Sequence, residues 1–174
     1  NNGTYSTSLP QAKNAGTYTI WYYVEGNEVT CGREHGQQKL VDALVNSCNC
    51  AYAQIALQLG ADTLEKYVEK YKLTESLHFD GITTAEGYFS LDNATNPEIA
   101  WSAIGQYHDS VNPCRFLTFM GMIAGGGSAA EPHLVAEVSA GGTTTYSAKT
   151  ATTGRLMTSA TAEKMQKLMQ IIFI

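Results

Sequence analysis

Two apolar runs with a polar segment between them make up the stretch ALVNSCNCAYAQIALQLG, residues 43–60. The polar segment, residues 46–50, reads Asn-Ser-Cys-Asn-Cys and stands where a continuous helix would otherwise pass. Ser47 is of a residue type favoured at helix N-caps, and Gly60 is of the type that often ends a helix. After Ser47, small and apolar residues recur at helical spacing, at Ala51, Ile55, Ala56 and Leu59. The pattern predicts a helix over 40–59 that is interrupted at the polar segment and begins again with Ser47 as its N-cap.

A second helix is predicted directly after Gly60. Asp62 and Glu65 have the spacing of a capping box. One apolar stripe then follows, at Leu64, Tyr67, Val68 and Tyr71. Because the connection between the two helices is short, we expect them to pack as an antiparallel hairpin.

Two further helices begin at clear start signals. Asn112-Pro113 pairs an N-cap residue with a proline at the first helical position, and the glycines at 125–127 end that helix. Thr158 caps a last helix, whose stripe runs through Ala162, Met165, Leu168 and Met169. Residues 74–98, before these helices, show no clear period and are predicted to be a loop.

The strand signals lie early and late in the chain. TYTIWYYVEG, residues 17–26, is β-branched and aromatic and predicts an extended segment. HLVAEV and TTTYSAKT, separated by Gly141-Gly142, predict a β-hairpin. Since the helices come first and the strand pair late, the order predicts an α+β fold, a mostly helical subdomain with a short antiparallel β element.

Length and charge limit the classes of protein. The 174 residues suffice for one domain with a core, and the net charge of -5 excludes a typical nucleic-acid binder. No run approaches the roughly 18 apolar residues of a membrane span. Residues 1–15 are polar and expected to be loose, whereas the chain stops on the apolar residues 171–174. We interpret the chain as a piece of a longer protein, with a possible dimer through that apolar end.

Cysteine and histidine spacing gives no metal pattern. The four cysteines are Cys31, Cys48, Cys50 and Cys114. Cys48 and Cys50 lie two apart on a predicted helix, so they point to different faces and do not share one metal ion. The spacing of the cysteines and of the four histidines matches no zinc motif. We expect one disulfide or none, no metal and no cofactor.

The polar segment allows two interpretations. Capping alone accounts for a serine and an asparagine at the start of a helix. The hydroxyl of Ser47 and the amide of Asn49 can also project side by side into a cleft. There they would suit proton relay and the binding of a substrate amide. These residues by themselves leave both interpretations open.

Five segments in a fixed order carry a family resemblance. They are HGQQKLVDALVNSCNCAYAQIALQLG (35–60), IAWSAIGQ (99–106), VNPCRFLTFMGMIAGGG (111–127), EPHLV (131–135) and RLMTSATAEKMQKLM (155–169). In order and spacing the chain resembles the transpeptidase domain of the penicillin-binding proteins. The resemblance implies that residues 1–174 are part of such a domain, with the likeness in residues 30–174 and the fold of that family.

The same resemblance implies a serine acyltransferase that cross-links peptidoglycan stem peptides and binds β-lactams. In the family, the serine of an S-x-x-K motif attacks the D-Ala-D-Ala carbonyl, its lysine is the base, and a K-T-G strand binds the substrate carboxylate. Ser47-Cys48-Asn49 matches the S-x-N motif. Ser47 would relay a proton to the leaving group, Asn49 would hydrogen-bond the substrate amide, and Cys48 would be a variable residue. The parent would be anchored in the bacterial membrane on its extracytoplasmic face.

The chain departs from the family pattern at several positions. It contains no S-x-x-K and no K-T-G, and in KTATTG, residues 149–154, Ala151 stands where a glycine is required. Tyr107 follows the I-G-Q segment, and Cys114-Arg115 follows the proline of the helix start. We expect the missing motifs to lie beyond the two ends, and this chain alone to be inactive. The alternatives are a non-catalytic β-lactam sensor or scaffold of the same fold, or a serine β-lactamase.

Overall fold

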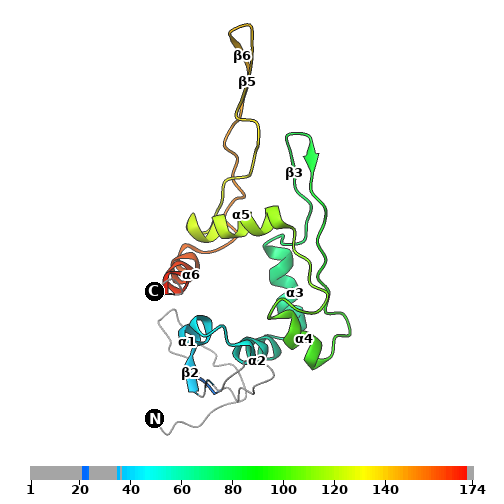
Figure 1. Ribbon diagram of the computed structural model, residues 1–174, viewed down its shortest axis with the longest axis vertical. Helices are drawn as coiled ribbons and strands as arrows, with labels where there is room; N and C mark the ends of the chain where they lie inside the picture. The colour runs from blue at the N-terminus through cyan, green and yellow to red at the C-terminus, as the bar shows by residue number, and fades with distance from the viewer. Residues whose placement is uncertain (1–20, 24–34, 36, 172–174) are drawn as a thin grey trace. The chain divides into compact units, whose positions relative to one another are not determined.

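The structure is a computed structural model that describes residues 21–23, 35 and 37–171. Its helices, shown in Figure 1, are α1 (Leu40–Val45), α2 (Asn49–Leu59), α3 (Ala61–Lys70), α4 (Asn96–Ser102), α5 (Pro113–Ala124) and α6 (Ser159–Ile171). Its strands are β1 (Trp21–Tyr23), β2 (Gln37–Lys39), β3 (His78–Phe79), β4 (Ile82–Thr83), β5 (Glu137–Ala140) and β6 (Thr143–Ser147). The strands pair in sequence order as three two-stranded antiparallel sheets. The predicted α+β class, mostly helical with short antiparallel strands, is confirmed.

Several predictions fall on residues that the structure does not describe. They concern residues 1–15, most of the strand predicted over 17–26, Cys31, and the apolar end at 172–174 with its possible dimer. Of the predicted strand, Trp21–Tyr23 is described and is β1. In the described part of the chain, no helix combines the length and the apolar character that crossing a membrane requires.

The described residues form two compact units. The first takes its described residues from 21–64 and 91–107, with Ile171, and the second consists of Glu65–Ser90 and His108–Gln170. Helix α3 passes from the first unit to the second along the chain. The predicted packing of α2 against α3 therefore spans both units and stays a prediction.

Small buried side chains hold the first unit together. Strand β2 runs directly into α1, and α2 packs against α4. The side chains of Ala43, Cys48 and Ala51 are buried together where α1 meets α2, and Cys50 packs against them. Because these side chains are small, the two short helices can approach closely. The predicted break within residues 40–59 is confirmed, since α1 ends at Val45 and α2 begins at Asn49.

Two predictions in this unit need correction. Helix α3 begins at Ala61, so Asp62 lies inside its first turn and is not the N-cap of a capping box. There its carboxylate still interacts favourably with the positive end of the helix dipole. Residues 96–98 were predicted as loop but begin α4, at a capping box formed by Thr95 and Glu98. The box was missed because the residues around it are of types common in loops.

The second unit contains a hairpin where a loop was predicted. Strands β3 and β4 lie within residues 74–98, joined by Asp80-Gly81. Both turn residues have positive φ, 50° and 79°, as a two-residue type I′ turn requires. Asp-Gly is a strong signal for this turn, but strands of two residues each are too short to show alternation.

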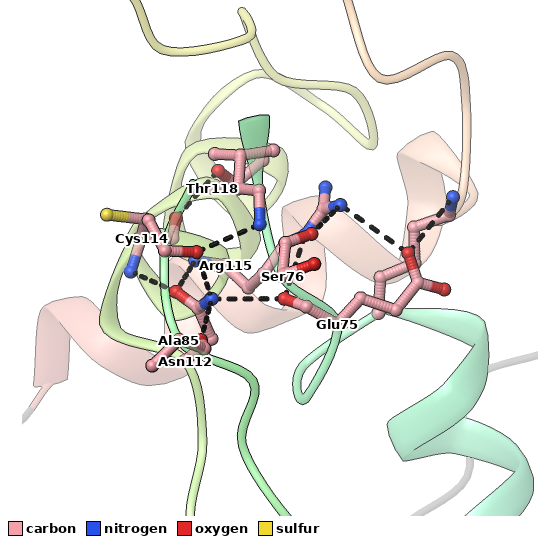
Figure 2. Close-up of polar contacts among 10 residues, drawn as sticks. Glu75, Ser76, Ala85, Asn112, Cys114, Arg115 and Thr118 are labelled. Carbon is pink, nitrogen blue, oxygen red and sulfur yellow. Dashed lines mark hydrogen bonds and ion pairs between the residues drawn. The ribbon is translucent and has the colours of Figure 1, made fainter. Parts of the chain in front are cut away.

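Helix α5 begins at a buried asparagine, as predicted. The Asn112 Oδ1 atom accepts hydrogen bonds from the backbone N–H groups of Cys114 (3.0 Å) and Arg115 (3.4 Å). Its Nδ2 donates to the carbonyl oxygens of Glu75 (3.1 Å) and Ala85 (2.8 Å), as Figure 2 shows. The Arg115 guanidinium donates to the carbonyl of Ser76 at 2.8 Å. Asn112 therefore fixes the start of α5 against the segments on either side of the β3–β4 hairpin.

The other end of the second unit follows the predicted signals. Thr158 Oγ1 accepts from the Thr161 N–H at 3.1 Å at the start of α6. A hydrophobic cluster in this unit has the buried side chains of Ile123, Met157 and Ala162 at its centre. Partly buried side chains pack around it, those of Tyr71, Phe119, Met120, Met165 and Met169. The predicted hairpin is confirmed as β5–β6, which projects beyond α5 in Figure 1 and has exposed side chains along both strands.

Candidate functional site

The polar segment ends one helix before it begins the next. The Ser47 N–H donates to the Leu44 carbonyl at 3.1 Å, and the Cys48 N–H donates to the Ala43 carbonyl at 2.9 Å. These two bonds form a Schellman motif, in which the residue after the C-cap takes a left-handed conformation. Asn46 is the C-cap of α1, and Ser47 follows it with a φ of 47°. Ser47 thus occupies a position at which glycine is usual.

This geometry corrects the predicted role of Ser47. The N-cap of α2 is Cys48, whose side chain makes no capping hydrogen bond, so Ser47 does not cap that helix. The prediction was wrong because serine favours caps by its side chain, whereas here the backbone of the preceding helix determines the turn. The Cys48 carbonyl accepts from the N–H groups of Ala51 (3.1 Å) and Tyr52 (3.2 Å), which starts α2.

The segment exposes its two candidate catalytic residues and buries the cysteine between them. Ser47 and Asn49 are exposed, whereas Cys48 has an exposed fraction of 0%. Cys48 was predicted to be only a variable residue, yet its thiol packs against Ala43 and Ala51. The buried thiol anchors the turn, and the hydroxyl and the amide on either side of it are left accessible.

The residues around this turn supply further polar groups that the sequence analysis missed. Asn46 Nδ2 donates to Gln38 Oε1 at 3.4 Å, and the Lys39 N–H donates to Asp42 Oδ2 at 3.0 Å at the start of α1. Gln38 is 3% exposed. No sequence signal pointed to it, because a glutamine in a short strand is expected to face solvent.

Tyr52 lies one helical turn after Cys48. Burial raises the pKa of the Tyr52 phenol, and the nearby Cys48 thiol adds to the shift.

The I-G-Q segment follows α4 in the same unit as Ser47. The Trp101 carbonyl accepts from the N–H groups of Ile104 (3.2 Å) and Gln106 (3.0 Å), and Gly105 has a φ of 72°. The Trp101 side chain is 55% exposed, so it does not belong to a buried core within this unit. Tyr107, where the family pattern has another residue, also has a positive φ of 69°.

A cavity in the second unit does not fit a peptide. Its volume is about 50 Å³, enough for a few water molecules. It is lined by Tyr71, Lys72, Arg115, Thr118, Met122, Glu131, Thr153 and Leu156. Across residues 21–23, 35 and 37–171, no cluster of histidine, cysteine and carboxylate side chains could hold a metal ion.

Comparison with known proteins places this geometry in a family context. The family model described as "Penicillin binding protein transpeptidase domain" matches residues 8–172. The stage V sporulation protein D of Bacillus subtilis (strain 168) is 26% identical over 117 residues, which are 66% of this chain and 18% of that protein. This chain thus spans less than a fifth of the length of this curated relative.

Solved structures share the fold. The crystal structure of PBPA from Mycobacterium tuberculosis matches with a TM-score of 0.73 and 24% identity over 82% of this chain and 34% of that chain. The ceftriaxone acyl-enzyme complex of penicillin-binding protein A from the same organism gives 0.76 and 20%, covering 91% and 38%. The D,D-transpeptidase domain of a peptidoglycan glycosyltransferase from Eggerthella lenta gives 0.67 and 21%, covering 81% and 38%. The match over residues 8–172 shows that this chain belongs to the penicillin-binding protein transpeptidase domain family.

Proposed function

We propose that residues 1–174 are part of the catalytic domain of a D,D-transpeptidase that cross-links peptidoglycan stem peptides. The observation that carries the proposal is the turn at Ser47, which exposes a hydroxyl and an amide on either side of the buried Cys48. This turn occurs in a chain of the transpeptidase family. Ser47 and Asn49 therefore lie at the surface, on the solvent side of the small core of α1 and α2.

The reaction needs a proton donor at one defined step. A serine oxygen attacks the carbonyl carbon of the D-Ala-D-Ala peptide bond, an ester forms, and the C–N bond breaks. An amine leaves poorly unless its nitrogen receives a proton. We assign this delivery to Ser47, whose hydroxyl donates its proton to the leaving nitrogen and regains one from the base of the nucleophile.

Asn49 has a complementary role in the proposal. It is the first residue of α2, directly after the N-cap Cys48, and is exposed at the surface. Its Nδ2 group would donate to the carbonyl of the substrate amide and hold the peptide against the nucleophile. A β-lactam would use the same contacts, because its ring amide occupies the place of the scissile peptide bond.

The nucleophile, the base and the strand that binds the carboxylate are proposed to come from outside residues 1–174. The protein that carries this segment would be anchored in the bacterial membrane and act on its extracytoplasmic face. Its partners would be the stem peptide and β-lactams, and it would require no metal and no cofactor. The segment by itself would have no acyl-transfer activity.

A fluorescent penicillin tests the proposal directly. The full-length gene product should carry an S-x-x-K motif before residue 1 and form a covalent, denaturation-resistant adduct, whereas the 1–174 chain should form none. A stable adduct on the 1–174 chain would contradict the assignment of the nucleophile. A full-length product without S-x-x-K and without adduct would favour the sensor or scaffold alternative instead.

A further inference from the structure

Gln38 is a buried polar residue beside the candidate site. It lies in β2, opposite Tyr22 of β1, and has an exposed fraction of 3%. Its Oε1 atom accepts from Asn46 Nδ2 at 3.4 Å, at the long end of the hydrogen-bond range. Its buried Nε2 atom has no acceptor among the described residues. Buried amides normally satisfy both groups, so a buried glutamine with one satisfied group calls for a specific reason.

The bond from Gln38 reaches the residue that directly precedes Ser47. Strand β2 enters α1 at Leu40, and Asn46 is the C-cap at the other end of that helix. The Gln38–Asn46 bond thus links the entry of α1 to its exit. The left-handed conformation of Ser47, with a φ of 47°, is unfavourable for serine and persists only where the surroundings hold it.

Among the described residues, three kinds of contact help to hold this turn. The Schellman hydrogen bonds fix the backbone, the thiol of Cys48 fixes the core side, and the Gln38 amide fixes Asn46 from the side of β2. The first two set where the chain turns. The Gln38 contact holds the side chain of Asn46, the residue whose peptide bond leads into Ser47.

We propose that Gln38 is a positioning residue, which orients the hydroxyl of Ser47 through Asn46. This inference rests on the proposed function, in which Ser47 delivers the proton to the leaving nitrogen. Gln38 itself touches no substrate. Its loss should therefore slow the step that needs this proton and leave steps that do not need it unchanged.

The choice of leaving group separates positioning from mere stability. An amine must be protonated to leave, whereas a thiolate leaves without a proton because its conjugate acid is far stronger. A peptide ending in D-Ala-D-Ala and a matched thioester therefore differ in their need for Ser47. A variant that only destabilises the fold lowers the turnover of both substrates equally.

The experiment compares both substrates in the full-length gene product. Gln38→Leu should lower kcat for the peptide about tenfold with little change in KM, and should leave the thioester rate within about twofold, since general acid catalysis contributes about 10²–10⁴. Gln38→Glu keeps an acceptor for Asn46 and should recover most of the peptide rate. Gln54, a half-buried residue in the middle of α2, offers the control: Gln54→Leu makes the same chemical change and should alter neither rate.

Ser47→Ala is the reference variant and keeps the two proposals distinguishable. It should lower the peptide rate by about 10² and spare the thioester. If Ser47→Ala affects both substrates equally, the proposed role of Ser47 is wrong. If Ser47→Ala is selective but Gln38→Leu is not, the proposed function stands and the positioning role of Gln38 is refuted.

A folding defect in Gln38→Leu would not prevent the test. Asn46→Ala removes the donor of the same hydrogen bond and should give the same selective loss. The double variant should be no more selective than either single variant, because both break one contact. Independent, multiplying effects on the ratio of the two rates would overturn the proposal.

Discussion

Helices α1 and α5 end with the same hydrogen-bond pattern but with different residues at the left-handed position. After α5, the Gly126 N–H donates to the Ile123 carbonyl (3.4 Å) and the Gly127 N–H to the Met122 carbonyl (2.7 Å). Gly126 has a φ of 69° and carries no side chain. After α1, Ser47 takes the equivalent place. One turn uses the residue that fits best, and the other accepts a less favourable residue that presents a hydroxyl.

The end of α3 shows that strain alone does not identify a functional residue. There Lys72 takes the left-handed position with a φ of 57°, and its N–H and that of Leu73 make the same two bonds, to Glu69 and Val68. The Lys72 ammonium pairs with the Glu75 carboxylate at the surface, at 3.4 Å. The candidate role of Ser47 therefore rests on its neighbours Cys48 and Asn49 and on the family, and the conformation adds to them.

The largest effect is expected where the α5 turn has no space for a side chain. A Cβ atom at Gly127 would lie 2.0 Å from the Met157 carbonyl oxygen, at a φ of 113°. Gly127→Ala should destabilise the second unit by about 3 kcal/mol or more, through overpacking and an unfavourable conformation. Hydrogen exchange at the amides of Leu156 and Met157, which donate to the Gly127 carbonyl, measures this loss.

Gly126→Ala is the matched control for this change. Nothing lies within 4 Å of its added Cβ, so only the left-handed backbone is penalised. The loss should be about 1 kcal/mol. Equal losses for both variants would show that the close approach to Met157 does not contribute.

The next largest effect concerns the N-caps of α5 and α6, whose removal should cost different amounts of stability. Asn112→Ala removes the cap of α5 and the contacts to the segments around β3–β4, and should cost about 2–3 kcal/mol. Thr158→Ala removes only an exposed cap of α6 and should cost about 1 kcal/mol. Hydrogen exchange within each helix gives the two values, and a smaller effect for Asn112→Ala would contradict the buried contacts in Figure 2.

Substitution of Ser47 tests the comparison itself. Ser47→Gly should stabilise the turn after α1 by up to about 1 kcal/mol, because glycine adopts the left-handed conformation readily. Ser47→Ala should leave stability nearly unchanged, since alanine is strained as serine is. Thermal unfolding of the full-length product distinguishes the two variants. In both, the rate with the D-Ala-D-Ala peptide should fall while the rate with the thioester is kept. A destabilised Ser47→Gly would mean that the hydroxyl itself holds the turn.

The smallest effect concerns another left-handed residue, Asp80. Its Oδ2 atom accepts from the N–H groups of Leu134 (2.5 Å) and Val135 (3.0 Å). The hydrogen bond from Leu134 first, then that from Val135, lowers the pKa of the Asp80 carboxyl below its ordinary 3.8, and His133 adds to this. The stabilisation is thus fully present above pH 3.8 and is lost as the pH falls through the lowered pKa.

Amide chemical shifts of Leu134 and Val135, followed through acid titration, measure this contact. They should move together below pH 3.8 in the wild type. In Asp80→Asn they should show no such transition. Movement at the same pH in Asp80→Asn would assign the titration to another group.

Local signals predicted the parts of the fold that local chemistry determines. Asn112-Pro113, the glycines at 125–127, Gly141-Gly142 and Thr158 each marked a boundary that the structure confirms. Ser47 was correctly predicted to lie at a break between two helices. It was wrongly predicted to be the N-cap of the second helix, because a non-glycine residue in a Schellman turn has no sequence signature.

Contacts between distant residues could not be predicted. Asn112 was read as a cap, and its bonds to Glu75 and Ala85 depend on how the chain returns to that point. The bond between Gln38 and Asn46 depends on how β2 folds back along α1, which the local sequence does not show. For the candidate site, the residue types Ser47 and Asn49 could be predicted from the motif, whereas the groups that orient them could not.

The burial of Cys48 turns the segment into a reporter of its own motion. A thiol reagent can reach this sulfur only when the contact between α1 and α2 opens, because its exposed fraction is 0%. Cys114, half-buried at the start of α5 and outside that contact, supplies an internal standard for reagent access. The ratio of the two labelling rates would measure how often the turn that holds Ser47 comes apart, in the resting protein and while a β-lactam is bound.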